Sequence, residues 1–173
     1  MEIKDIKKGD YLVYGTNGIC LVDEISEMVF PNGGERKLYF ILRPTKDTGS
    51  IIYIPHDNAT LLSKLRPVLT GKEAEALLTE PHSATDWIDD RKLRTLAFRE
   101  TLQESDPNAL VPLVKCICLK RDELSGQNKK LSCADREVLT AAISAICGEL
   151  SFSLGLSHDE IAEKLQNNLK IAL

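Results

Sequence analysis

The sequence changes its pattern near residue 66, and this change limits the possible folds more than any other feature. Before it, short runs of β-branched and aromatic residues alternate with glycine-rich turn signals, which is typical of strands joined by tight turns. Asn-Gly and Gly-Gly in PNGGE favour a hairpin. The predicted strands are YLVY (11–14), ICLVDEISEMVF (19–30), RKLYFILR (36–43) and IIYIP (51–55). Residues 1–66 are therefore expected to form a small β-barrel of the SH3-like or Tudor-like kind.

Residues 67–173 carry helix-start signals instead of turn signals. Thr70 and Glu73 form a capping box, and Pro81 ends the helix that this box begins. Ser83 starts a similar pattern, which predicts a helix that continues through Leu102. The remaining helices are expected after Asp106-Pro107, with a kink or a delayed start at Pro112, after Ser132 and after Ser157. The prediction is an α+β chain whose second domain is all-helical, with about five helices.

Composition and motifs exclude several classes of protein. No apolar run approaches the ~20 residues of a membrane span, and the opening MEIKDIKKGD lacks an apolar signal region, so a cytoplasmic protein is expected. The three histidines belong to no catalytic or metal-binding motif, so we expect neither an enzyme nor a bound cofactor. Five cysteines, without the spacing of a disulfide framework, are expected to be buried small side chains: Cys20, Cys116, Cys118, Cys133 and Cys147.

The segment TDWIDDRKLR (85–94) holds the only tryptophan, Trp87. The net charge of the chain is −4, yet residues 91–136 contain ten Lys or Arg against six Asp or Glu. On the predicted helix Trp87, Arg91 and Arg94 would share one face. The residues alone leave two interpretations open. The ring can wedge between DNA bases, beside basic side chains, or it can pack against the barrel or the linker, with Arg91 stacked on it and Asp90 paired with Arg94.

Several motifs, in the same order along the chain, resemble a known family. In the first half they are KKGDYLVYGTNGICLVDEI, YFILRP and IIYIP, and in the second half they are Trp87 followed by a basic helix, KKLSCADREVL and GELSFSLG. This arrangement is similar to that of the CarD/CdnL-like bacterial transcription regulators, and it covers nearly the whole chain. Their first domain is shared with the RNA-polymerase-interacting domain of transcription-repair coupling factor.

The resemblance implies a regulator of transcription with two working parts. The barrel would bind the RNA polymerase β subunit, at its lobe or protrusion, partly by edge-strand pairing. The helical domain would stabilise or modulate the open promoter complex, with a Trp wedge at the upstream edge of the bubble. The polymerase contacts implied are Met28, Tyr53, Ile52 and Arg36, and the DNA contacts implied are Trp87, Arg91, Lys92, Arg94, Lys129 and Lys130.

The sequence departs from well-known members at five of the positions that this resemblance aligns. Met28 and Tyr53 stand where those members carry arginines, so the polymerase contact would be more apolar. Ile88, Asp89 and Asp90 fill the three positions after the tryptophan, within which those members carry basic residues, and the charge of the two aspartates would repel phosphates. The alternative function is a monomeric interaction module that bridges RNA polymerase to another factor, with Trp87 buried and no direct DNA contact. As a transcription regulator the chain is also expected to be a monomer, and to contact promoter DNA only within the polymerase complex.

Overall fold

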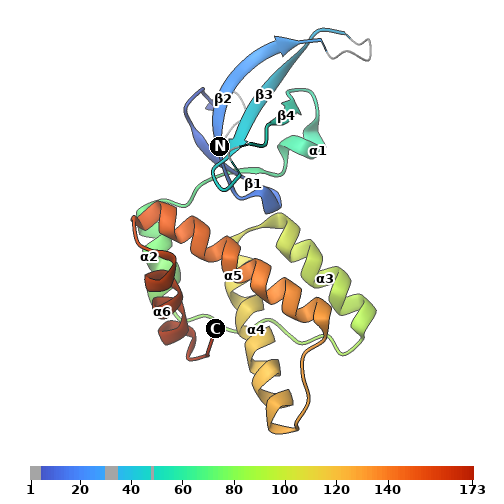
Figure 1. The fold of residues 1–173 in the computed structure, drawn as a ribbon, viewed down its shortest axis with the longest axis vertical. Helices are drawn as coiled ribbons and strands as arrows, with labels where there is room; N and C mark the ends of the chain where they lie inside the picture. Colours follow the sequence, from blue (N-terminus) through green and yellow to red (C-terminus); the bar gives the residue numbers. More distant parts are fainter. Residues whose placement is uncertain (1–4, 30–34, 48) are drawn as a thin grey trace. The chain divides into compact units, whose positions relative to one another are not determined.

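The computed structural model describes residues 5–29, 35–47 and 49–173, and the chain divides into two compact units, Met1–Val68 and Leu69–Leu173. The strands lie in the first unit and the long helices in the second, as Figure 1 shows. This distribution confirms the predicted α+β class. Phe30 and residues 31–34 of the predicted PNGGE turn lie outside the described residues.

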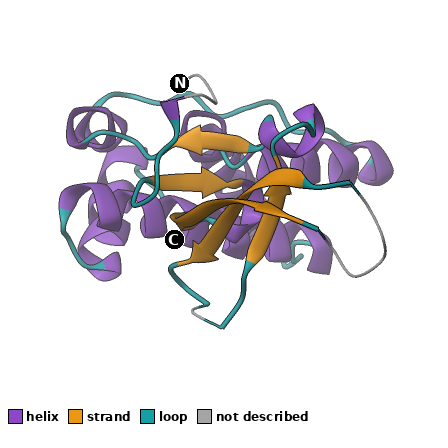
Figure 2. Ribbon diagram, turned by 90° about the horizontal axis from the view of Figure 1, so that it is seen from above, coloured by secondary structure: helices purple, strands orange, loops and turns teal. Residues whose placement is uncertain are grey.

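The first unit contains the strands β1 (Tyr11–Tyr14), β2 (Ile19–Met28), β3 (Lys37–Pro44), β4 (Ile52–Pro55) and β5 (Leu65–Pro67), with a 3-10 turn at Gly15–Asn17 and the short helix α1 at Ala59–Leu62. All neighbours are antiparallel, and the order across the sheet is β4-β3-β2-β1-β5. The strands, orange in Figure 2, cross one another at steep angles in a strongly twisted sheet. Met28 of β2 lies opposite Lys37 of β3, as the predicted hairpin requires.

The turn between β1 and β2 explains a glycine of the GTNG motif. Gly18 has φ 70° and ψ −145°, a backbone conformation that side chains with a Cβ avoid. Its N–H donates to the carbonyl of Gly15 at 3.2 Å, and its carbonyl accepts from the N–H of Tyr14 at 2.9 Å. The turn brings β2 back beside β1, over a core made of Ile6, Leu12, Cys20, Val22, Phe40, Leu42, Ile54 and Leu62.

The second unit has five long helices, the number predicted: α2 (Gly71–Thr79), α3 (Arg91–Glu104), α4 (Pro107–Gly126), α5 (Cys133–Leu154) and α6 (His158–Leu169). Helix α5 packs against each of the other four and forms the centre of this unit. Among the described helices, α5 alone is long and apolar enough to cross a membrane by length and composition. The central residues Ala142, Ile146 and Leu150 are buried in the core of this unit, so packing accounts for part of this apolar character.

Most predicted helix starts are confirmed, because capping chemistry is local. Thr70 and Ser157 form complete capping boxes, and the Ser132 hydroxyl accepts from the N–H of the third helical residue. Asp106 caps α4, which begins at Pro107. The predicted delay at Pro112 is wrong, since α4 already begins at Pro107 and contains Pro112 in its interior.

The predicted start of α3 is wrong. The helix begins at Arg91 rather than near Ser83, and residues 81–88 have no regular secondary structure. Asp90 is the cap, and its carboxylate accepts from the N–H groups of Lys92 and Leu93 at 2.8 and 2.9 Å. The Ser83 pattern offers an aspartate where a capping box needs the longer glutamate to reach back to its cap. Trp87 therefore precedes the helix instead of lying on it.

The prediction for the cysteines is right for four and wrong for one. Cys20, Cys116, Cys118 and Cys147 are buried, and Cys133 is exposed. Cys133 is the first residue of α5, on a turn that lies before the helix enters the core. Burial raises the pKa of the Cys20 thiol to about 11, which suits a side chain that serves as a small apolar group.

Candidate functional site

Trp87 is half-buried and is held on several sides by the helical unit. Its ring packs against the edge of the core, and Phe98 of α3 meets it edge-to-face, with ring centroids 5.9 Å apart. The guanidinium carbon of Arg94 lies 4.3 Å from the ring centroid, and the ammonium of Lys120 on α4 lies 5.6 Å from it. Aromatic and cation–π contacts of this kind favour one ring position over others. The ring is thus anchored, yet part of it still reaches solvent.

Arg94 is 7% exposed, although the sequence predicted it as a DNA contact. Its Nε and Nη2 atoms donate to the two carboxylate oxygens of Asp135 on α5, at 3.1 and 3.2 Å. Its Nη1 atom donates to the backbone carbonyls of Ile88 and Asp89, at 2.8 and 3.1 Å. The Arg94 guanidinium therefore faces the protein interior in this structure. The predicted pairing of Arg94 with Asp90 is wrong, and so is the predicted stacking of Arg91 on the ring, because Arg94 occupies that place.

Asp135 completes this arrangement. It is 3% exposed, and it accepts a hydrogen bond from the Ser132 hydroxyl at 2.7 Å in addition to the two from Arg94. Burial would raise the pKa of this carboxyl, but the hydrogen bonds from Arg94 and Ser132 and the charge of Arg94 outweigh burial and lower its pKa. The carboxylate is therefore ionised at neutral pH. No local pattern could have shown its role, because Arg94 and Asp135 are 41 residues apart in the sequence.

The other basic residues predicted to contact DNA are exposed. Arg91 and Lys92 are the first two residues of α3, a few positions after Trp87. Lys129 and Lys130 lie in the connection between α4 and α5, where Lys129 donates to the Gln127 side chain at 3.1 Å. Arg91 and Lys92 thus follow the tryptophan segment directly, whereas Lys129 and Lys130 belong to a different loop.

The acidic residues near Trp87 have different surroundings. Asp90 is engaged in capping α3, so its charge also interacts favourably with the N-terminal end of the helix. Asp89 is exposed, and its backbone carbonyl is held by Arg94. The charge near the ring is therefore mixed, because Asp86, Asp89 and Asp90 are exposed there together with Arg91 and Lys92.

The residues predicted to bind polymerase divide between the two faces of the sheet. Tyr53 of the edge strand β4 is 38% exposed and lies opposite Ile41, on the outer face. Ile52 packs against the core, so its side chain points away from that face, and its position on the edge strand leaves its backbone as the part that can pair. Met28, the last residue of β2, is half-buried. Arg36 is exposed and pairs with Glu27 at 3.8 Å, a surface contact worth little.

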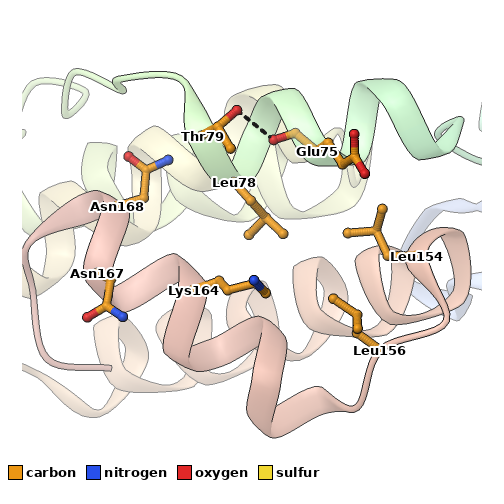
Figure 3. A pocket seen from close by; sticks show the side chains of 8 residues that line it. All are labelled: Glu75, Leu78, Thr79, Leu154, Leu156, Lys164, Asn167 and Asn168. Atoms are coloured by element: carbon orange, nitrogen blue, oxygen red, sulfur yellow. Dashed lines mark hydrogen bonds between the residues drawn. The ribbon is translucent and has the colours of Figure 1, made fainter.

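A cavity of about 690 Å³ opens in another part of the helical unit, between α2, the end of α5 and α6 (Figure 3). Leu78, Leu154 and Leu156 give it an apolar lining, and Glu75 and Lys164 add one charge of each sign. None of the predicted site residues lines it. Within the described ranges, no group of three or more His, Cys, Asp or Glu side chains could hold a metal ion.

Comparison with known families gives a match in the first unit. Residues 6–68 match the family described as the CarD-like/TRCF RID domain. The matched range begins just before β1 and ends at the boundary between the two units. A comparison with curated proteins finds no matching relative.

Proposed function

Because residues 6–68 form a CarD-like/TRCF RID domain, an RNA-polymerase-interacting domain, we propose that this chain regulates transcription from the polymerase itself. The sheet unit binds the β subunit, and the helical unit acts on promoter DNA next to it. The chain is a cytoplasmic, non-enzymatic regulator in this proposal. The observation that carries it is the family match over residues 6–68, a range that includes the strands β1 to β5.

Docking on the β subunit uses the edge strand β4 and the outer face beside it. An edge strand presents backbone N–H and C=O groups that can pair with a strand of a partner. Tyr53 offers an aromatic side chain next to that edge, and aromatic residues are enriched where interfaces bury most surface. With Met28 at the end of β2, this surface is more apolar than one built on arginines.

The helical unit is proposed to favour the open form of the promoter. Trp87 is partly exposed and is followed by two exposed cations, Arg91 and Lys92. A side chain that binds only an unstacked base step shifts the equilibrium toward open DNA. The net charge of −4 opposes DNA binding by the chain alone. Docking on polymerase overcomes this, because it holds the helical unit at a high effective concentration beside the DNA.

Two variants test the two parts of the proposal separately. Tyr53→Ala should weaken capture of the full chain by immobilised β subunit, and Tyr11→Ala is the matched control, since Tyr11 is an aromatic residue of the same sheet that is 44% exposed. Trp87→Ala should leave that capture unchanged and shorten the lifetime of the open complex. Equal capture of both tyrosine variants would contradict the docking surface. An unchanged lifetime with Trp87→Ala would remove the DNA wedge.

A second function is favoured by the contacts of Trp87. Its ring is half-buried and lies against Arg94, Phe98 and Lys120, as expected for a packing residue in a module that bridges polymerase to another protein. Tryptophan fluorescence separates the two. If the acrylamide quenching and the emission of Trp87 are the same in the open promoter complex as in the free protein, the bridging module is the better description.

A further inference from the structure

We propose that Arg94 is a positioning residue that presents Trp87, and that it acts through the ring rather than on DNA. Asp135 holds Arg94 in place from α5. This inference rests on the proposed function, since it explains how the tryptophan segment is set for its role. It also replaces the role that the sequence suggested for Arg94.

The hydrogen bonds of Arg94 leave little capacity for a phosphate. A guanidinium has five N–H donors. Four contacts are made within the unit: two to the oxygens of Asp135 and two to the carbonyls of Ile88 and Asp89. The side chain is 7% exposed. To reach a phosphate, Arg94 would have to leave a buried carboxylate unpaired, which is strongly unfavourable.

The same contacts fix both the ring and the backbone of the tryptophan segment. Arg94 covers the ring at 4.3 Å, while its Nη1 atom holds the carbonyls of the two residues that follow Trp87. The backbone before the tryptophan is held by a bond from the Thr85 N–H to the carbonyl of Pro112 at 3.3 Å. Because this segment is not a helix, it lacks the repeated backbone hydrogen bonds that would hold it in place. The hydrogen bonds from Arg94 to its carbonyls hold it instead.

The chemistry requires arginine in particular. Only a planar fork can donate to both oxygens of Asp135, donate sideways to two carbonyls and stack on an indole at the same time. Lysine keeps the positive charge but offers a single ammonium, so it cannot make all three kinds of contact. Arg94→Lys therefore separates positioning from charge. Lys92, exposed on the same helix, is the matched cation whose contribution would come from direct contact with phosphate.

The decisive experiment is a double-mutant cycle on open-complex lifetime, with full-length protein and polymerase. Arg94→Lys should shorten the lifetime several-fold in the chain that has Trp87 and should have no further effect in the Trp87→Ala background. Lys92→Met should shorten it in both backgrounds, and should reduce the salt dependence of the effect by about one phosphate contact. If Arg94→Lys is equally harmful with and without Trp87, Arg94 contacts DNA and the positioning role is overturned.

A second measurement, on the free protein, tests the positioning role separately from the proposed function. Arg94→Lys should make Trp87 more accessible to acrylamide and shift its emission to the red, with helix content unchanged by circular dichroism. Unchanged quenching would overturn the positioning role, whatever the lifetime shows. If instead Trp87→Ala leaves the lifetime unchanged while the quenching of Arg94→Lys rises, the DNA role fails and the positioning role stands. Should Arg94→Lys lower the helix content, Asp135→Asn, nearly the same size and shape, takes its place in both measurements.

Discussion

Removal of Asp135 should destabilise the helical unit far more than removal of an exposed partner of arginine. In Asp135→Ala the Arg94 guanidinium stays buried, with no anion beside it and with two backbone carbonyls and the Trp87 ring as its remaining partners. Breaking a buried ion pair on one side costs about 3–5 kcal/mol. The two bonds that Arg94 loses, at 3.1 and 3.2 Å, join its guanidinium to both carboxylate oxygens. We therefore expect a loss in this range in the free energy of unfolding.

Urea unfolding followed by tryptophan fluorescence is the suitable assay. Trp87 is the only tryptophan and lies in the second unit, so its signal follows the unfolding of that unit without a contribution from the sheet. Asp122→Ala is the matched control. It removes the partner of Arg121 at 3.0 Å, where the two side chains are 31% and 55% exposed, and should cost below about 1 kcal/mol.

A double variant distinguishes the loss of the Arg94–Asp135 ion pair from the cost of leaving Arg94 buried without a carboxylate. Arg94→Met combined with Asp135→Leu leaves no unpaired buried charge, and such replacements are often neutral or stabilising. The double variant should therefore unfold at higher urea than Asp135→Ala. The reasoning is refuted if Asp135→Ala costs no more than Asp122→Ala, because Arg94 would then be satisfied without its carboxylate.

Three further predictions follow from described residues. The pKa of Asp135 is lowered in the folded state, so the stability that this carboxylate contributes is present above its unfolded pKa of about 4 and is lost as the pH falls through the lower folded pKa. Acid should therefore reduce the urea midpoint of the wild type more than that of Asp135→Asn. In native protein a thiol reagent such as Ellman's should modify Cys133 quickly and Cys20 only on unfolding, and rapid release of two equivalents would contradict this burial. Gly155 has φ 68° at the C-cap of α5, so Gly155→Ala should cost about 1–2 kcal/mol in thermal unfolding, whereas Gly126→Ala, at a helical glycine with open space around it, should cost nothing.

The sequence predicted those parts of the fold whose causes are local. The caps at Thr70, Ser132 and Ser157 each act within three residues, so the residues themselves are sufficient evidence for the helices that follow. The runs of β-branched and aromatic residues between turn signals likewise predicted the strands β1, β2, β3 and β4, because strand propensity and turn chemistry act over a few residues.

The start of α3 was predicted wrongly although its cap, Asp90, is local, because the Ser83 pattern also resembles a helix start and the contacts that hold the tryptophan segment outside the helix are distant. Arg94 captures the carbonyls of Ile88 and Asp89, and Asp135, 41 residues away, holds Arg94. The sequence spacing predicted Trp87 on a helix beside Arg91. In the structure Trp87 precedes the helix, and Arg94, paired with Asp135, takes the place beside its ring. Asp135 and Ser132 were missed as site residues for the same reason. Their only local signal was that of an ordinary helix start.

Helix α5 ties the surroundings of Trp87 to the rest of the unit. It is 22 residues long, about 33 Å, and touches all four other helices, with Asp135 in its first turn and Leu154 at its far end. Because α5 packs against all four other helices, it cannot unfold without disrupting them. Its central amides should therefore exchange with solvent only when the whole helical unit unfolds. Residues 81–88 have no regular secondary structure, so their amides can exchange by small local openings. Trp87 thus lies in a segment whose amides should exchange quickly. Arg94 and Asp135 connect this segment to α5, the helix whose amides should exchange most slowly.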